Sequence, residues 1–317
     1  MRSRNYLRLG ILGITVMLLA GAYWHPVAGQ LLYWKGGALE ARLYGFERAQ
    51  LRAGEHDWTY FHAQHPDQPT VLLLHGFTAD KNVWPRFARH LLPDYSVLIP
   101  DLPGYGESSH DAAASYSIPA QAARVIEFLD ALRLTQVHMM GNSMGGELAA
   151  YMAAAYPQRV LSMALLDPGG LASPQPSELD KRAAAGANPF VVSSAEEFQA
   201  FYALTMAQPP WLPPSIKQAL ADDYMQRRQD YARIFKELRA RSSVAALLEQ
   251  IHAPSLLVWG KDDQLLDVSA VPLWQAAIPH IEIEVWPGIG HMPMVEAPPK
   301  LAARYQAFLQ QVLKQSS

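Results

Sequence analysis

The sequence predicts an α/β fold, in which a mostly parallel sheet is covered by helices on both faces and carries an inserted helical cap. From residue 57 onward, short apolar runs rich in β-formers alternate with longer amphipathic stretches, which is typical of parallel sheets flanked by helices. The alternation stops between residues 171 and 251, where the pattern becomes helical and is interrupted by prolines, and it then resumes.

The alternating segments place the individual elements. Strands are predicted at residues 70–74, 96–100, 136–140, 160–166, 255–259 and 281–285. Helices are predicted at residues 83–92, 119–132, 144–156, 268–278 and 299–313. We therefore expect a core formed by residues 53–170 and 252–317, with residues 171–251 as the cap.

Composition restricts the classes of protein to consider. Half of the 317 residues are apolar, 17% are charged and the formal net charge is -3, as in globular proteins that do not bind nucleic acid. The chain has no cysteine, which excludes disulfides and thiolate metal sites. No metal-ligand constellation, phosphate loop or dinucleotide motif is present, so we expect neither a metal nor a cofactor.

Residues 1–28 are typical of a membrane anchor or a secretory signal. Arg2, Arg4 and Arg8 precede a stretch in which no Lys, Arg, Asp or Glu appears before Lys35. Small residues at 20–22 resemble a signal cleavage site, but apolar character resumes beyond them and favours a retained single-pass anchor. The arginines should stay in the cytoplasm, which places the rest of the chain on the non-cytoplasmic side, periplasmic in a bacterium.

A connecting helix is predicted over residues 29–52. Its apolar residues recur with helical spacing between charged ones, and they are Leu32, Leu39, Leu43, Tyr44 and Phe46. The pattern fits a helix packed on the domain and a helix lying in the membrane interface equally well.

The central motif is the G-x-S-x-G at residues 141–145. An apolar strand candidate leads into it and the helix-forming residues 147–150 follow, so the chain must turn sharply at Ser143. Glycines two positions before and after the serine remove side chains that would collide in such a turn. This context predicts that Ser143 is a nucleophile exposed at the end of the sheet.

A serine nucleophile needs a base, and the base needs an orienting carboxylate. Of the eleven histidines, His291 is the best placed, because it lies in the loop between the last predicted strand and the final helix. Asp262, Asp263 and Asp267 follow the strand at 255–259, and Asp167 follows the strand at 160–166. Position alone does not separate Asp262 from Asp263.

The oxyanion formed by attack at a carbonyl requires two backbone N–H groups. One should belong to Met144, directly after the nucleophile and at the start of its helix. The other should come from the loop after residue 74, where Phe77 is the natural donor. His75 in the same loop is expected to hold the loop in place.

These motifs occur in the order and at the intervals of a known superfamily. The segments at 75–77, 101–108, 141–146, 259–267 and 290–291 resemble those of the α/β-hydrolases. Within them, the segments at 72–77, 167–170 and 259–269 are similar to membrane-anchored monoacylglycerol lipases and to bacterial membrane-bound lipases and phospholipases. The resemblance implies that the acid is Asp263, three residues after the glycine of the Trp-Gly pair, and it implies a membrane segment and a helical cap.

The cap supplies apolar residues that could line a channel for an acyl chain, namely Phe201, Tyr202, Met206 and Trp211. Packing within the cap itself is the alternative role for them. We expect a serine esterase that cleaves carboxylic ester bonds of lipids through an acyl-enzyme, with the membrane as a partner and a homodimer allowed. A carbon-carbon bond hydrolase or a thioesterase of the same fold, and a catalytically idle scaffold, are the alternatives.

Overall fold

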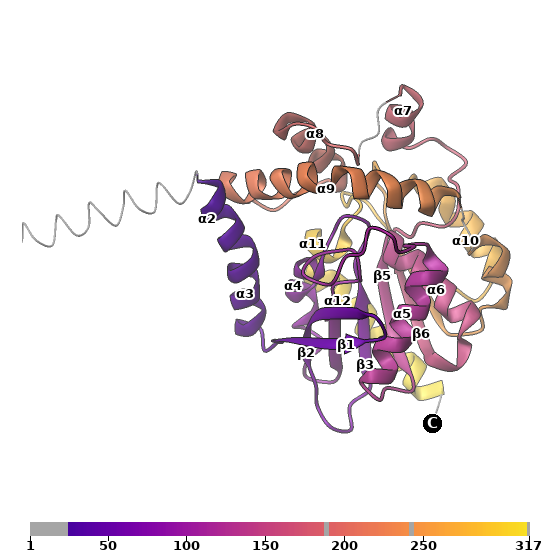
Figure 1. Ribbon diagram of the computed structural model, residues 1–317. Helices are drawn as coiled ribbons and strands as arrows, with labels where there is room; N and C mark the ends of the chain where they lie inside the picture. The colour runs from indigo at the N-terminus through magenta and orange to yellow at the C-terminus, as the bar shows by residue number, and fades with distance from the viewer. Residues whose placement is uncertain (1–24, 187–189, 241–243, 316–317) are drawn as a thin grey trace, which may run out of the picture.

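The computed structural model describes residues 25–186, 190–240 and 244–315, and within them the chain forms a central eight-stranded sheet with helices on both sides (Figure 1). The strands are β1 Glu47–Ala53, β2 His56–Ala63, β3 Thr70–Leu74, β4 Ser96–Pro100, β5 Val137–Asn142, β6 Val160–Leu166, β7 Ser255–Gly260 and β8 Glu282–Trp286. Their order in the sheet is β1-β2-β4-β3-β5-β6-β7-β8. β1 and β2 pair antiparallel, β2 pairs antiparallel with β4, and the remaining pairs are parallel.

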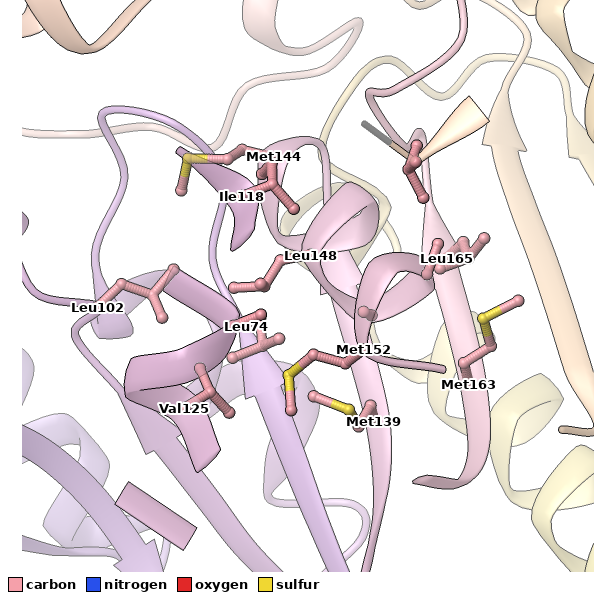
Figure 2. Packing of buried hydrophobic residues seen from close by; sticks show 14 of the residues in the cluster. Leu74, Leu102, Ile118, Val125, Met139, Met144, Leu148, Met152, Met163 and Leu165 are labelled. Atoms are coloured by element: carbon pink, nitrogen blue, oxygen red, sulfur yellow. The ribbon is translucent and has the colours of Figure 1, made fainter. Parts of the chain in front are cut away.

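Two apolar layers cover the sheet. On β3, Leu72 and Leu74 belong to one buried cluster, whereas Val71 and Leu73 belong to the other, as the alternation of a strand requires. The first layer is packed by α5 Ile118–Ala131, α6 Met144–Ala155 and α10 Val271–Ala277, and Figure 2 shows its side chains interleaved between β3, β5, β6 and α6. The second is packed by α3 Gly37–Leu43, α4 Pro85–Ala88, α11 Pro293–Glu296 and α12 Pro298–Gln315. The predicted fold class is confirmed.

The connecting helix predicted over residues 29–52 is wrong in its second half. The observed helical run consists of α2 Pro26–Leu31, the π-helical turn η1 Leu32–Gly36 and α3 Gly37–Leu43. It is followed by Gly45, whose φ of 97° is left-handed, and the chain then enters β1. Ala49, Leu51 and Ala53 pack against the sheet's apolar layer with a period of two. The polar or charged residues between them make this period hard to recognise in the sequence. The sheet therefore begins at Glu47.

The segment predicted as a cap contains helices and no strand among its described residues. These helices are α7 Glu178–Ala184, α8 Ala195–Thr205, α9 Pro214–Ala240 and the 3₁₀ turn η4 Ala245–Gln250. Figure 1 shows α9 lying across one end of the sheet. It is fastened to the core by Arg227, which donates to the carbonyl of Gly106, and by Arg233, which donates to that of Ala114.

The predicted amino-terminal anchor falls largely outside the described residues, which begin at residue 25. Within the described ranges, no helix combines the length and the apolar character needed to cross a membrane.

Candidate active site

Ser143 occupies the sharp turn between β5 and α6. Its backbone has φ 56° and ψ −118°, a left-handed conformation that is strained for a residue with a side chain. A Cβ on Gly141 would lie 2.0 Å from the carbonyl oxygen of Gly145, and a Cβ on Gly145 would lie 2.3 Å from that of Leu74. Only glycine fits at either position, so the motif is required by the turn itself.

His291 and Asp263 form the buried pair that a serine nucleophile needs. Nδ1 of His291 lies 2.7 Å from Oδ2 of Asp263, and both residues are buried. The other carboxylate oxygen, Oδ1, accepts hydrogen bonds from the amides of Leu265 at 2.7 Å and Leu266 at 3.1 Å, which fixes the acid. Because Nδ1 is occupied by the carboxylate, Nε2 is the nitrogen left for the serine proton.

The competing aspartates have other partners. Asp262 accepts a hydrogen bond from the amide of Gly288 at 2.8 Å, and Asp267 caps a 3₁₀ turn by accepting from the amide of Ser269 at 2.9 Å. Both therefore stabilise the loops around the site. The geometry separates Asp263 from Asp262, which sequence position alone could not do.

Two residues that the sequence analysis did not select hold the histidine loop. Asn142 donates from its side chain to the carbonyl of His291 at 2.9 Å, which ties the β5 turn to this loop. Glu296 accepts from the amides of Gly290 at 3.0 Å and Met292 at 3.3 Å. Asn142 stands inside the G-x-S-x-G motif and could have been suspected, whereas nothing in the sequence marks Glu296.

Asp167 is a second buried carboxyl beside the pair. It is fully buried, has a left-handed φ of 44°, and accepts from the amide of Gly260 at 2.7 Å. Burial raises its pKa well above the ordinary range, and the nearby negative charge of Asp263 raises it further.

Asp167, Asp263 and His291 bring their oxygen and nitrogen atoms within 4.8 Å of one another, a spacing that would also suit a metal ion. Three of the atoms that would bind the metal are already engaged, because Asp263 bonds both His291 and two backbone amides and Asp167 bonds Gly260. The donor set therefore fits a hydrogen-bonded acid–base relay better than a metal site.

The expected oxyanion donors, Met144 and Phe77, both border the cavity onto which Ser143 opens. Met144 is the first residue of α6, so its N–H has no partner within the helix. His75 holds the Phe77 loop as expected: its Nε2 accepts from the amide of Leu102 at 3.0 Å, and its Nδ1 bonds the carbonyl of Gly76. Burial lowers the pKa of His75 to about 4, so this histidine is neutral.

Ser143 and His291 open onto a cavity of about 640 Å³ beneath the cap. This volume lies within the range of roughly 300–1,000 Å³ that is usual for small-molecule sites. Its wall is mostly apolar and includes Phe190 and Phe235, whose rings pack against that of Phe77. A serine hydroxyl, an imidazole and a mostly apolar cavity therefore meet at one place.

Comparison with known proteins gives the family. The family model described as the alpha/beta hydrolase fold matches residues 69–298, which is more than half of the chain. The chain is an α/β-hydrolase. Lipase 1 of Psychrobacter immobilis is 36% identical over 241 residues, covering 75% of this chain and 76% of that protein. Monoacylglycerol lipase ABHD6 of Mus musculus is 28% identical over 318 residues, covering 96% and 94%.

Solved structures give the same grouping. A bacterial membrane phospholipase A matches this hydrolase with a TM-score of 0.87 and 35% identity, over 98% of this chain and 99% of that chain. A 2-hydroxy-6-oxo-6-phenylhexa-2,4-dienoate hydrolase from Rhodococcus has a TM-score of 0.72 at 20% identity, over 84% and 99%, which shows a shared fold alone.

Of the four cap residues expected to line the hydrolase's acyl channel, two line the cavity. These two are Phe201 and Tyr202. Met206 and Trp211 are not among its lining residues, which corrects that expectation. α8 ends at Thr205, and the backbone of Met206 then packs against Gly290. Trp211 lies in the following loop, where 72% of its surface is exposed.

Proposed function

We propose that this α/β-hydrolase cleaves carboxylic ester bonds of lipids through an acyl-enzyme on Ser143. His291 takes the hydroxyl proton as the serine attacks the ester carbonyl, and it passes that proton to the departing alcohol. Asp263 orients the imidazole and stabilises its charged form. Water then attacks the acyl-enzyme with His291 again as the base, and the fatty acid leaves. The observation that carries the proposal is the 2.7 Å Asp263–His291 pair, whose histidine borders the same cavity as the strained Ser143.

The oxyanion of each tetrahedral intermediate would be held by the amides of Met144 and Phe77. Donors of this kind act on charge that develops only in the transition state, and removing one donor commonly costs about 10²–10³ in kcat. The apolar wall supports an acyl chain as the bound group, with Phe201 and Tyr202 as contacts. The similarity to a lipase, a monoacylglycerol lipase and a phospholipase A supports lipid esters over other esters.

We also infer that residues 1–28 anchor the hydrolase in a membrane, with the catalytic domain on the non-cytoplasmic side. The uncharged stretch and the arginines before it support this, as does the similarity to a membrane phospholipase A. Release of the full-length protein from membranes by high salt alone would contradict the anchor. A homodimer stays a prediction, for which light scattering in detergent is the direct measurement.

The test of the chemistry compares Ser143→Ala with Ser162→Ala in the purified full-length protein. Ser162 is a matched control, because it lies 2.8 Å from Nδ1 of His138 but is buried in the sheet away from the cavity. On a panel of acylglycerols, lysophospholipids, phospholipids and acyl thioesters, Ser143→Ala should lose at least about 10⁴-fold in kcat, and Ser162→Ala should stay within a few-fold.

A fluorophosphonate probe should label the wild type and Ser162→Ala but not Ser143→Ala. Full ester hydrolysis by Ser143→Ala would refute the mechanism. Preference for thioesters over every oxygen ester would refute the substrate class while leaving the nucleophile in place.

A further inference from the structure

One carboxyl in the wall of the cavity takes no part in the mechanism above. Glu147 lies on α6 one helical turn after Ser143, and its amide donates to the carbonyl of Ser143 at 3.0 Å. It lines the cavity although only 7% of its surface is exposed. Within the described chain, its Oε1 is buried without a hydrogen-bond partner. An orphaned buried oxygen of this kind calls for an explanation, because leaving it unpaired typically costs about 1–3 kcal/mol.

Two glycines lie close against this carboxyl. A Cβ on Gly169 would lie 3.2 Å from Oε2 of Glu147, and a Cβ on Gly170 would lie 3.0 Å from its Cγ and 3.3 Å from its Cδ. A larger residue at either position would press on the glutamate. Glycine at these two positions therefore lets the segment after β6 approach Glu147 without displacing its side chain.

The described wall of the cavity offers Glu147 no fixed positive charge. Among the described residues that line the cavity there is no lysine or arginine. Burial alone raises the pKa of Glu147 to about 7, so near neutral pH the group exists both as a carboxylate and as a neutral acid.

We propose that Glu147 is a specificity-determining residue that bonds a free hydroxyl on the alcohol part of the substrate, as in a partial glyceride or a lysophospholipid. This inference rests on the proposed ester hydrolysis at Ser143. A hydroxyl donates to the carboxylate and accepts from the neutral acid, so it pairs with both forms. An ammonium group pairs only with the carboxylate, and its desolvation in an apolar wall is far more costly.

The spacing along α6 suits this role. Four residues of helix separate Glu147 from Ser143 by about 6 Å along the axis. A hydroxyl on the glycerol carbon adjacent to the ester lies a few bonds from the reacting carbonyl, on the leaving-group side. A fully acylated or methylated alcohol offers no such donor and would leave Glu147 unpaired, which is the kind of difference that discriminates strongly in a buried site.

The experiment measures one ratio, kcat/KM for monolauroylglycerol divided by kcat/KM for methyl laurate, in the full-length protein. Both substrates carry the same acyl chain, and only the first has free hydroxyls. Glu147→Leu should lower the ratio about tenfold, which corresponds to about 1.4 kcal/mol. Glu147→Gln, which keeps a donor and an acceptor, should stay within about threefold of the wild type. Glu249→Gln removes an exposed carboxylate on η4 and should leave the ratio unchanged.

An unchanged ratio in Glu147→Leu overturns the proposal, as does an equal loss on both substrates. If Glu147→Leu does not fold, the same ratio measured on Glu147→Ala decides, with the same expected direction. Failure of the wild type to hydrolyse either ester would instead refute the proposed function, so the two failures are distinguishable.

Discussion

Replacing Glu147 by glutamine should stabilise the protein, and it should do so only at higher pH. The folded state raises the pKa of this buried carboxyl from 4.5 to about 7. Below pH 4.5 the group is protonated in both the folded and the unfolded state, and it contributes no penalty. As pH rises toward 7, the unfolded chain ionises freely while the folded chain retains the proton. Stability therefore falls through this interval and stays lower above it.

The size of the stability penalty follows from the difference between the two pKa values of Glu147, 4.5 and about 7. At about 1.4 kcal/mol per pH unit, the penalty accumulates to about 3 kcal/mol at pH 8. Glutamine has nearly the same shape and does not ionise, so Glu147→Gln escapes this penalty. The variant and the wild type should have similar stability at pH 5, and the variant should be more stable by about 2–3 kcal/mol at pH 8. Other titrating groups cancel, because they are common to both proteins.

The assay is urea unfolding of both full-length proteins in the same detergent at pH 5, 6, 7 and 8, with the midpoint and slope fitted separately. Glu249→Gln, which removes an exposed carboxylate, serves as the control. A stability difference between Glu147→Gln and wild type that is the same at pH 5 and pH 8 would refute the argument that Glu147 is buried and uncompensated.

Four further substitutions test the site and its supports. Asp263→Asn should lower kcat by about 10³–10⁴ with the fold intact, whereas Asp262→Asn should cost less than tenfold, as initial rates on one ester will show. Asn142→Ala removes the 2.9 Å bond that holds the histidine loop and should lower kcat about tenfold at nearly constant KM. Lys81→Met leaves the buried Asp101 without the ammonium group that is bonded to it at 2.7 Å. Urea unfolding at pH 8 should show a free energy of unfolding lower by about 3–5 kcal/mol.

The sequence predicted the parts of the fold whose signal is local. An apolar run marks the strand at 160–166. The turn at Ser143 is marked by glycines that no other residue could replace. β1 was missed because its inward residues are small or partly exposed and its outward residues are charged, so the same letters also fit a helix. What decided between the two was pairing with β2, an interaction with residues that follow a turn.

In the candidate site too, residues marked by a local sequence signal could be predicted, and residues selected by distant contacts could not. Ser143 and His291 could be selected because a motif and a chain order mark them, but the choice between Asp262 and Asp263 depends on where a loop directs each side chain. Glu296 supports the histidine loop by accepting amide hydrogens, and any loop carboxylate would look the same in sequence. Glu147 was passed over as an ordinary helix former, because its burial depends on residues distant in the sequence, Gly169 and Gly170 among them.

The cap is joined to the catalytic machinery at the oxyanion loop. Thr78 directly follows Phe77, has a left-handed φ of 63°, and donates from its hydroxyl to the carbonyl of Phe77 at 2.6 Å. Because that hydroxyl is already a donor, the bond between it and Tyr224 on α9 must be donated by the tyrosine. Asp263 and His291 are bound to each other, and Asn142 at the end of β5 bonds the backbone of His291. The cap also bonds the loops of the base and the acid, because the amide of Gln208 donates to Glu296 at 2.9 Å and the amide of Leu179 donates to the carbonyl of Gln264 at 3.1 Å. A change in the cap can therefore be transmitted to the loops of all three groups.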